Sequence, residues 1–157
     1  MNKLETPMTR RYWKRVGGTL LEEYPIVPPH RGVGRRVVDA VIIVDGVRRI
    51  ASPNSVSLDG HDLIVVQTKA QPRRLGMSLL GQALFSRLLI EDRFAPGSVR
   101  TAAPCAADDA VLRPITDRFG IEVVDTGRKQ NGVFCALLRI SRRHSFSSRT
   151  APTGGAG

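Results

Sequence analysis

The sequence predicts an α/β fold in which helices flank a mixed central sheet. Short apolar runs of strand length alternate along the chain with longer stretches whose apolar residues recur at helical spacing. With 157 residues, 41% of them apolar, the chain can build one core of ordinary composition. We therefore expect one domain over residues 1–140, followed by a disordered basic tail rich in Ser, Arg and Gly over residues 141–157.

The first part of the chain is predicted to hold a helix, a short extended piece and a loop. Residues 8–23 place apolar side chains at helical spacing behind Thr9, which can cap the helix. The pair Gly17-Gly18 weakens this helix. The segment "YPIVP" is extended between prolines, and residues 28–36, "PPHRGVGRR", form a basic loop.

Three strands are predicted in the centre of the chain. "VVDAVII" and the apolar run after Asp45-Gly46 form a hairpin, because Asp-Gly between two apolar runs favours a tight turn. After a turn-like stretch, residues 62–70, "DLIVVQTKA", read as a buried strand that ends in polar residues.

The second half alternates helix and strand. "RLGMSLLGQALFSRLLIEDRF" is a helix, and "SVRTAAPCA" is the strand that follows it. The apolar stripe of that helix is Leu75, Leu79, Leu80, Ala83, Leu84 and Leu88. "ADDAVLRPITDRFG" is a helix closed by Gly120, with Pro114 inside it, and "IEVVDT" and "GVFCALLRI" are strands.

Charge and cysteine content narrow the class of protein. The net charge of +10 favours a polyanionic partner, nucleic acid before an anionic membrane, while 5% aromatic residues disfavour a base-stacking surface of the single-strand-binding type. Cys105 and Cys135 lack the spacing of a zinc site and are expected to be reduced, buried thiols. The absence of a long apolar run and of a signal-peptide pattern predicts a cytoplasmic protein with no membrane association.

Polar residues inside two of the predicted strands indicate a charged site. Gln67 and Lys69 share one face at the end of their strand, and Asp39 interrupts an apolar strand. An ionised carboxylate there is unfavourable unless it is paired or binds a cation. If the two strands are neighbours, Asp39 and the Gln67 amide can hold Mg²⁺, and Lys69 can orient a water or stabilise a phosphate.

A glutamate of the first helix is expected to complete this metal shell. Glu22 and Glu23 are both candidates. Glu23 is preferred because it lies three residues after Leu20, closer to the buried face.

These residues and their order resemble the PD-(D/E)xK nuclease superfamily. The resemblance covers roughly residues 8–125 and rests on the helix-one glutamate, Asp39, the "QTK" segment and Gln82 in the next helix. It implies a restriction endonuclease-like αβββαβ core in which the acids hold Mg²⁺, or Mn²⁺ in its place. It also implies that Lys69 assists the attacking water and that Gln82 supports the site.

The chain departs from the superfamily pattern at two positions. Val38 stands where proline is common, and Gln67 stands where the second acid is expected. The "QxK" form resembles the branch that contains some methylation-dependent restriction enzymes. An amide oxygen can bind Mg²⁺ but brings no negative charge, so metal affinity is expected to fall.

The resulting expectation is a Mg²⁺-dependent nuclease that hydrolyses phosphodiester bonds in DNA, as a homodimer or with a partner subunit. The residues expected to contact DNA phosphates are Arg35, Arg36, Arg73 and Arg74. One alternative is an inactive nuclease-fold module that only binds DNA. The other is a basic α/β adaptor in which Asp39 forms a structural ion pair with Arg35 or Arg49.

Overall fold

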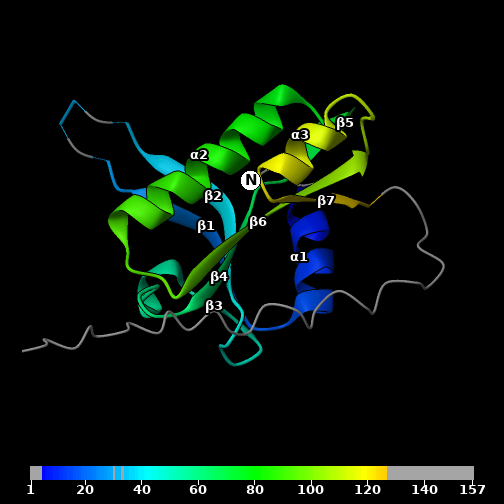
Figure 1. Cartoon of the computed structure of the whole chain (residues 1–157). Coiled ribbons are helices and arrows are strands. Elements are labelled where there is room, and N and C mark those ends of the chain that lie inside the picture. The colour runs from blue at the N-terminus through cyan, green and yellow to red at the C-terminus, as the bar shows by residue number, and fades with distance from the viewer. Residues whose placement is uncertain (1–4, 30, 33, 127–157) are drawn as a thin grey trace, which may run out of the picture.

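Helices and strands alternate along the chain, as the α/β prediction requires (Figure 1). The computed structural model describes residues 5–29, 31–32 and 34–126, without the side chains of residues 70–73. The elements are α1 (Glu5–Val16), β1 (Thr19–Val27), β2 (Arg36–Ile43), β3 (Arg49–Ala51), a 3₁₀ turn (Pro53–Ser55), β4 (Asp62–Val66), β5 (Lys69–Arg74), α2 (Met77–Arg93), β6 (Ser98–Ala107), α3 (Arg113–Arg118) and β7 (Ile121–Asp125). The predicted strand "GVFCALLRI", the predicted tail over residues 141–157 and Cys135 lie outside the described residues.

One mixed sheet runs through the described part of the chain in the order β3-β1-β2-β4-β6-β5, and β7 also pairs with β6. β1, β2 and β4 are antiparallel neighbours, with Leu21 opposite Val41 and Val41 opposite Val65. β6 runs parallel to β4, β5 and β7. β4 pairs with the first half of β6, and β5 pairs with its last residues, Cys105 and Ala107. The predicted mixed sheet with flanking helices is therefore confirmed.

The predicted hairpin around Asp45-Gly46 is wrong in its pairing. The turn is present, because the Gly46 amide donates to the Ile43 carbonyl over 3.2 Å. The returning strand β3, however, pairs in parallel with β1, with Ile50 opposite Leu20. Both edges of β2 are already occupied by β1 and β4, so the free edge of β1 is the one left for β3.

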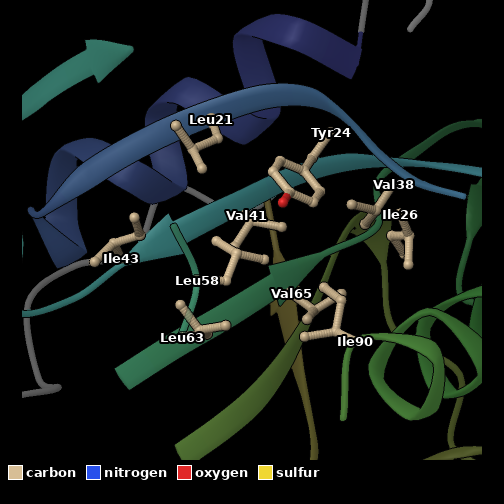
Figure 2. Packing of buried hydrophobic residues seen from close by; sticks show 10 residues of the cluster. All are labelled: Leu21, Tyr24, Ile26, Val38, Val41, Ile43, Leu58, Leu63, Val65 and Ile90. Atoms are coloured by element: carbon tan, nitrogen blue, oxygen red, sulfur yellow. The ribbon is translucent and has the colours of Figure 1, made fainter. Parts of the chain in front are cut away.

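The helices cover the two faces of the sheet (Figure 1). On one face, Tyr12 of α1 packs in a buried cluster with Ile42 and Ile64. On the other, Ile90 of α2 joins a cluster with Val41 and further residues of β1, β2 and β4, which Figure 2 shows converging from neighbouring strands. Apolar residues of each central strand thus alternate between two cores.

The first helix is shorter than predicted and lies earlier in the chain. α1 ends at Val16, because Gly17 and Gly18 adopt φ values of 84° and 76°, which favour glycine. A Cβ at Gly18 would also collide with the Ile43 carbonyl. The predicted helix over residues 8–23 is therefore wrong after Val16, and its second half is the strand β1.

The long helix α2 is confirmed, and its buried stripe differs from the prediction at one end. Leu79, Leu80 and Ala83 are buried, whereas Leu88 is 45% exposed and Ser86 and Ile90 face the core. None of the described helices is long and apolar enough to cross a membrane.

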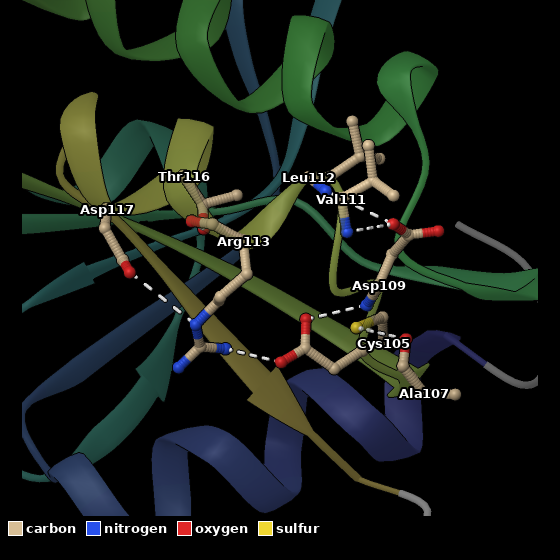
Figure 3. Close-up of polar contacts among 9 residues, drawn as sticks. Cys105, Ala107, Asp109, Val111, Leu112, Arg113, Thr116 and Asp117 are labelled. Atoms are coloured by element: carbon tan, nitrogen blue, oxygen red, sulfur yellow. Dashed lines mark hydrogen bonds and ion pairs between the residues drawn. The ribbon is translucent and has the colours of Figure 1, made fainter.

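The second predicted helix is reduced to the short α3, because Pro114 takes the first turn rather than the middle. The chain before it is a loop in which one Asp109 carboxylate oxygen accepts from the amides of Val111 (2.9 Å) and Leu112 (3.2 Å) (Figure 3). Arg113 then bridges Asp108 and Asp117.

The same region contains Cys105, whose thiol is buried and free in β6, as predicted. Its Sγ donates to the Ala107 carbonyl over 3.3 Å (Figure 3). Burial raises the pKa of this thiol to about 11, so it is neutral and unreactive at physiological pH.

Candidate active site

A pocket of about 660 Å³ opens where β2 begins and β4 ends. Its volume falls within the usual range for small-molecule sites. Residues from α1, β1, β2, the β4–β5 junction and α2 line it: Glu5, Ile26, Arg35, Arg36, Val37, Asp39, Gln67, Thr68, Lys69, Gln82, Phe85, Ser86 and Leu89. Four of the polar residues that the sequence singled out, Asp39, Gln67, Lys69 and Gln82, therefore share one pocket.

Asp39 is held against the end of β4. Its Oδ2 accepts a hydrogen bond from the Thr68 amide over 2.7 Å. Among the described residues it forms no ion pair with an arginine, so neither Arg35 nor Arg49 pairs with it as the adaptor alternative required. The pocket, rather than a structural salt bridge, is the environment of this carboxylate.

The backbone is distorted where Asp39 lies. Val38 and Val41 pack in the same core cluster although they are three residues apart, so the alternation of β2 shifts between them. Across the ladder, Ala40 faces Glu22 and Val38 faces Tyr24, which leaves Asp39 beside Glu23. Glu23 has a φ of 51°, the only positive value among described residues other than glycine. The positive φ of Glu23 marks this point of the β1–β2 ladder as irregular.

Burial is the main influence on the ionisation of Asp39. It raises the pKa of the carboxyl, and the nearby Glu5 carboxylate raises it further. The Thr68 amide and Lys69 act in the opposite direction. A bound cation would favour the ionised form, so the site is suited to exchange a proton for a positive ion.

The acid that α1 contributes to the pocket is Glu5. It lies one helical turn before Thr9, on the same face of α1. The Thr9 hydroxyl is fully buried and lies 2.9 Å from the Thr68 hydroxyl. This contact fixes α1 against the "QTK" segment and directs its first turn toward Asp39.

The prediction that Glu23 belongs to the first helix is wrong. Glu23 lies in β1, is exposed, and does not line the pocket. Its neighbour Glu22 accepts two hydrogen bonds of 2.8 Å from the Arg10 guanidinium, an ion pair at the surface. A sequence signal for Glu5 did exist: Pro7 is tolerated in the first turn of a helix, so the helix could begin before it.

Gln67 is buried, with 6% of its surface exposed, and is tied to α2. Its Nε2 donates to the Ser86 Oγ over 3.0 Å. Because Ser86 takes the nitrogen end of the amide, the oxygen is the end left for a ligand. Ser86 was not predicted as a functional residue.

Two polar side chains complete the pocket beside Gln67. The predicted single strand over residues 62–70 is wrong at its end, because β4 stops at Val66 and residues 67–68 leave the strand. Lys69 begins the separate strand β5 and is partly buried. Gln82 is an exposed residue of α2 on the pocket wall.

The predicted arginines divide into two groups. Arg35 and Arg36 line the pocket, and the Arg36 guanidinium donates to the carbonyls of Gly34 (3.1 Å) and Arg35 (3.3 Å). Arg74 lies exposed in β5, outside the pocket lining, and Arg73 belongs to the same strand.

Within the described ranges, no group of three or more His, Cys, Asp or Glu residues is placed to bind a metal. A cation in the pocket would therefore depend on two carboxylates, Glu5 and Asp39, together with the Gln67 amide oxygen and water. Oxygen donors of this kind suit a hard ion such as Mg²⁺, which takes few protein ligands and keeps several waters. The donor set fits such an ion better than it fits zinc, which prefers nitrogen and sulfur ligands.

Comparison with known proteins adds no relative to this description. No protein-family model, no curated protein and no solved structure matches the chain.

Proposed function

We propose that the chain is a Mg²⁺-dependent nuclease that cleaves phosphodiester bonds in DNA, with Mn²⁺ able to replace Mg²⁺. The observation that carries the proposal is the pocket in which Glu5 and Asp39 meet Gln67 and Lys69. The order of the main elements supports it: apart from β3 and β5, the chain runs through a helix, three antiparallel strands, a helix and a parallel strand, the order expected of a restriction endonuclease-like core.

Each residue has a specific role in this proposal. Glu5, Asp39 and the Gln67 oxygen would hold the ion, and Ser86 keeps the Gln67 amide in the required orientation. When bound, the ion would supply charge stabilisation at the phosphate and a water of lowered pKa. Lys69, which lines the same pocket, would orient that water and stabilise negative charge, and Arg35 and Arg36 would bind neighbouring phosphates.

The overall charge supports a polyanionic substrate. The chain carries 24 Lys and Arg against 14 Asp and Glu. Such an excess attracts nucleic acid without regard to sequence.

A cleavage assay tests the proposal. Plasmid DNA is incubated with wild type, Asp39→Ala or Lys69→Ala in the presence of Mg²⁺, Mn²⁺ or a chelator. The controls are Asp92→Ala, an exposed acid of α2, and Lys14→Ala, an exposed base of α1. We expect metal-dependent cutting that is lost in both pocket variants and retained in both controls.

Gln67 favours a second candidate function, a DNA-binding module without catalysis, because a neutral amide replaces one metal-binding charge. This alternative predicts that wild type cuts no DNA with either metal. It also predicts that wild type, Asp39→Ala and Lys69→Ala bind DNA with similar affinity.

A further inference from the structure

An exposed aromatic ring stands in the wall of the pocket. Phe85 of α2 is 65% exposed. Phenylalanine is usually buried, and the adjacent turns of α2 do contain buried residues. Ile26, Val37 and Leu89 line the pocket with it, and Val37 is itself 39% exposed. One part of the pocket wall is therefore apolar and open to solvent.

The remaining wall is polar, and positive charges outnumber negative ones in it. Arg35, Arg36 and Lys69 line the pocket against the two carboxylates of Glu5 and Asp39. The Arg36 guanidinium is held close to the start of β2 because it donates to two backbone carbonyls. A ligand that fills this pocket should thus combine a flat apolar face with at least one negative charge.

An unpaired nucleotide has this combination, whereas a base-paired one does not. Within a duplex both faces of each base are stacked on neighbouring bases, so an aromatic side chain cannot contact them without flipping the nucleotide out. In a single strand each base offers a free face for stacking on an aromatic ring, and the phosphates remain available to arginine.

We propose that the pocket binds an unpaired nucleotide, with its base stacked on Phe85 and its phosphate against Arg35 and Arg36. The inference rests on the proposed function and specifies its substrate as nucleic acid with an unpaired strand. The low aromatic content of the chain is consistent with one stacking position rather than an extended platform.

The kinetic test compares a single-stranded oligonucleotide with the duplex of the same sequence. Wild type should cleave the single strand with the higher kcat/KM. Phe85→Ala should raise KM for the single strand about tenfold with little change in kcat, and Phe85→Trp should retain low KM because the ring is kept. Leu88→Ala is the matched control, because Leu88 is 45% exposed on the same helix but does not line the pocket.

A fluorescence measurement tests binding independently of cleavage. Both proteins compared carry Asp39→Asn, which is expected to prevent cleavage during the measurement. The chain has a single tryptophan, so Phe85→Trp adds a second one. The fluorescence of the added tryptophan is the difference between Asp39→Asn/Phe85→Trp and Asp39→Asn. A single-stranded oligonucleotide should quench the added emission, and the matching duplex should quench it much less.

The possible outcomes separate the two proposals. Quenching together with weaker binding by Asp39→Asn/Phe85→Ala, but no cleavage of any substrate, would support the nucleotide site and refute the nuclease. Metal-dependent cleavage in which the duplex is preferred and Phe85→Ala has no effect would refute the nucleotide site and support the nuclease. Binding without quenching, or no binding at all, would also refute the nucleotide site.

Discussion

The hydroxyl groups of Thr9 and Thr68 lie 2.9 Å apart at a buried junction between α1 and the end of β4. The backbone amide of Thr68 at the same time donates to Asp39. Thr68 thus connects the helix that carries Glu5 to the strand that carries Asp39. Thr68 therefore contributes to the placement of Glu5 relative to Asp39.

We expect Thr9→Val or Thr68→Val to lower the free energy of unfolding by about 1–3 kcal/mol each, because either change removes the hydrogen bond between the two buried hydroxyls. The double variant should lose less than the sum of the two, since the second change has no shared hydrogen bond left to remove. Chemical denaturation measures all three, with Thr6→Val as the control on α1. Additive losses would show that the two hydroxyls do not interact.

Glu5→Gln should lower the metal-dependent cleavage rate by about 100-fold, because it removes one of two carboxylates from the pocket. Glu23→Gln should stay within about twofold of wild type, because Glu23 is exposed and outside the pocket. Single-turnover rates at saturating Mg²⁺ give the comparison. The reverse ranking would restore Glu23 as the metal-binding acid and exclude Glu5.

Asp39→Asn should make the protein more stable and inactive. Because burial raises the pKa of Asp39, the folded state holds this proton more tightly than the unfolded state. Stability is therefore lost as the pH rises from the ordinary carboxyl pKa of about 4 through the raised value. The stability advantage of Asp39→Asn should be smallest at acid pH and grow toward pH 7.

Denaturation of both proteins in metal-free buffer at several pH values measures this difference, with Asp92→Asn as the exposed control. A stability advantage of Asp39→Asn that shrinks as the pH rises would show that the pKa of Asp39 is not raised in the folded state. In the cleavage assay, wild-type activity should increase with pH over the same interval, because the ion requires the ionised carboxylate.

Gln67→Glu should restore a charge to the metal shell and place it in a buried position. We expect a lower Mg²⁺ concentration for half-maximal cleavage, together with a lower free energy of unfolding in the absence of metal. Gln67→Ala is the control that removes the ligand without adding charge. If Gln67→Glu and Gln67→Ala both need the same Mg²⁺ concentration as wild type, position 67 does not contact the ion.

The strands that bring the polar residues together could be predicted from the sequence. Asp39 and Gln67 interrupt apolar runs, and antiparallel neighbours place the start of one strand beside the end of the next, so a shared location followed once β2 and β4 were adjacent. Gln82 was predicted from the resemblance alone, and it lies on the wall of the same pocket.

The acid from the first helix could not be identified in the same way. Leu20 and Tyr24 fit helical spacing after Trp13, although both are core residues of β1. Periodicity alone does not separate the two assignments. The positive φ angles of Gly17 and Gly18, and the contact of Gly18 with the Ile43 backbone, decide between them.

The sequence by itself determined which residues are polar where a core is expected, because apolar patterning is local and is read within each segment. The tertiary structure alone decided that Glu5 rather than Glu23 lines the pocket, that β3 pairs with β1, and that Phe85 lies in the pocket wall. These relationships depend on which edges and faces remain free after the central strands have paired. Such competition is a property of the assembled sheet and is not encoded in any one segment.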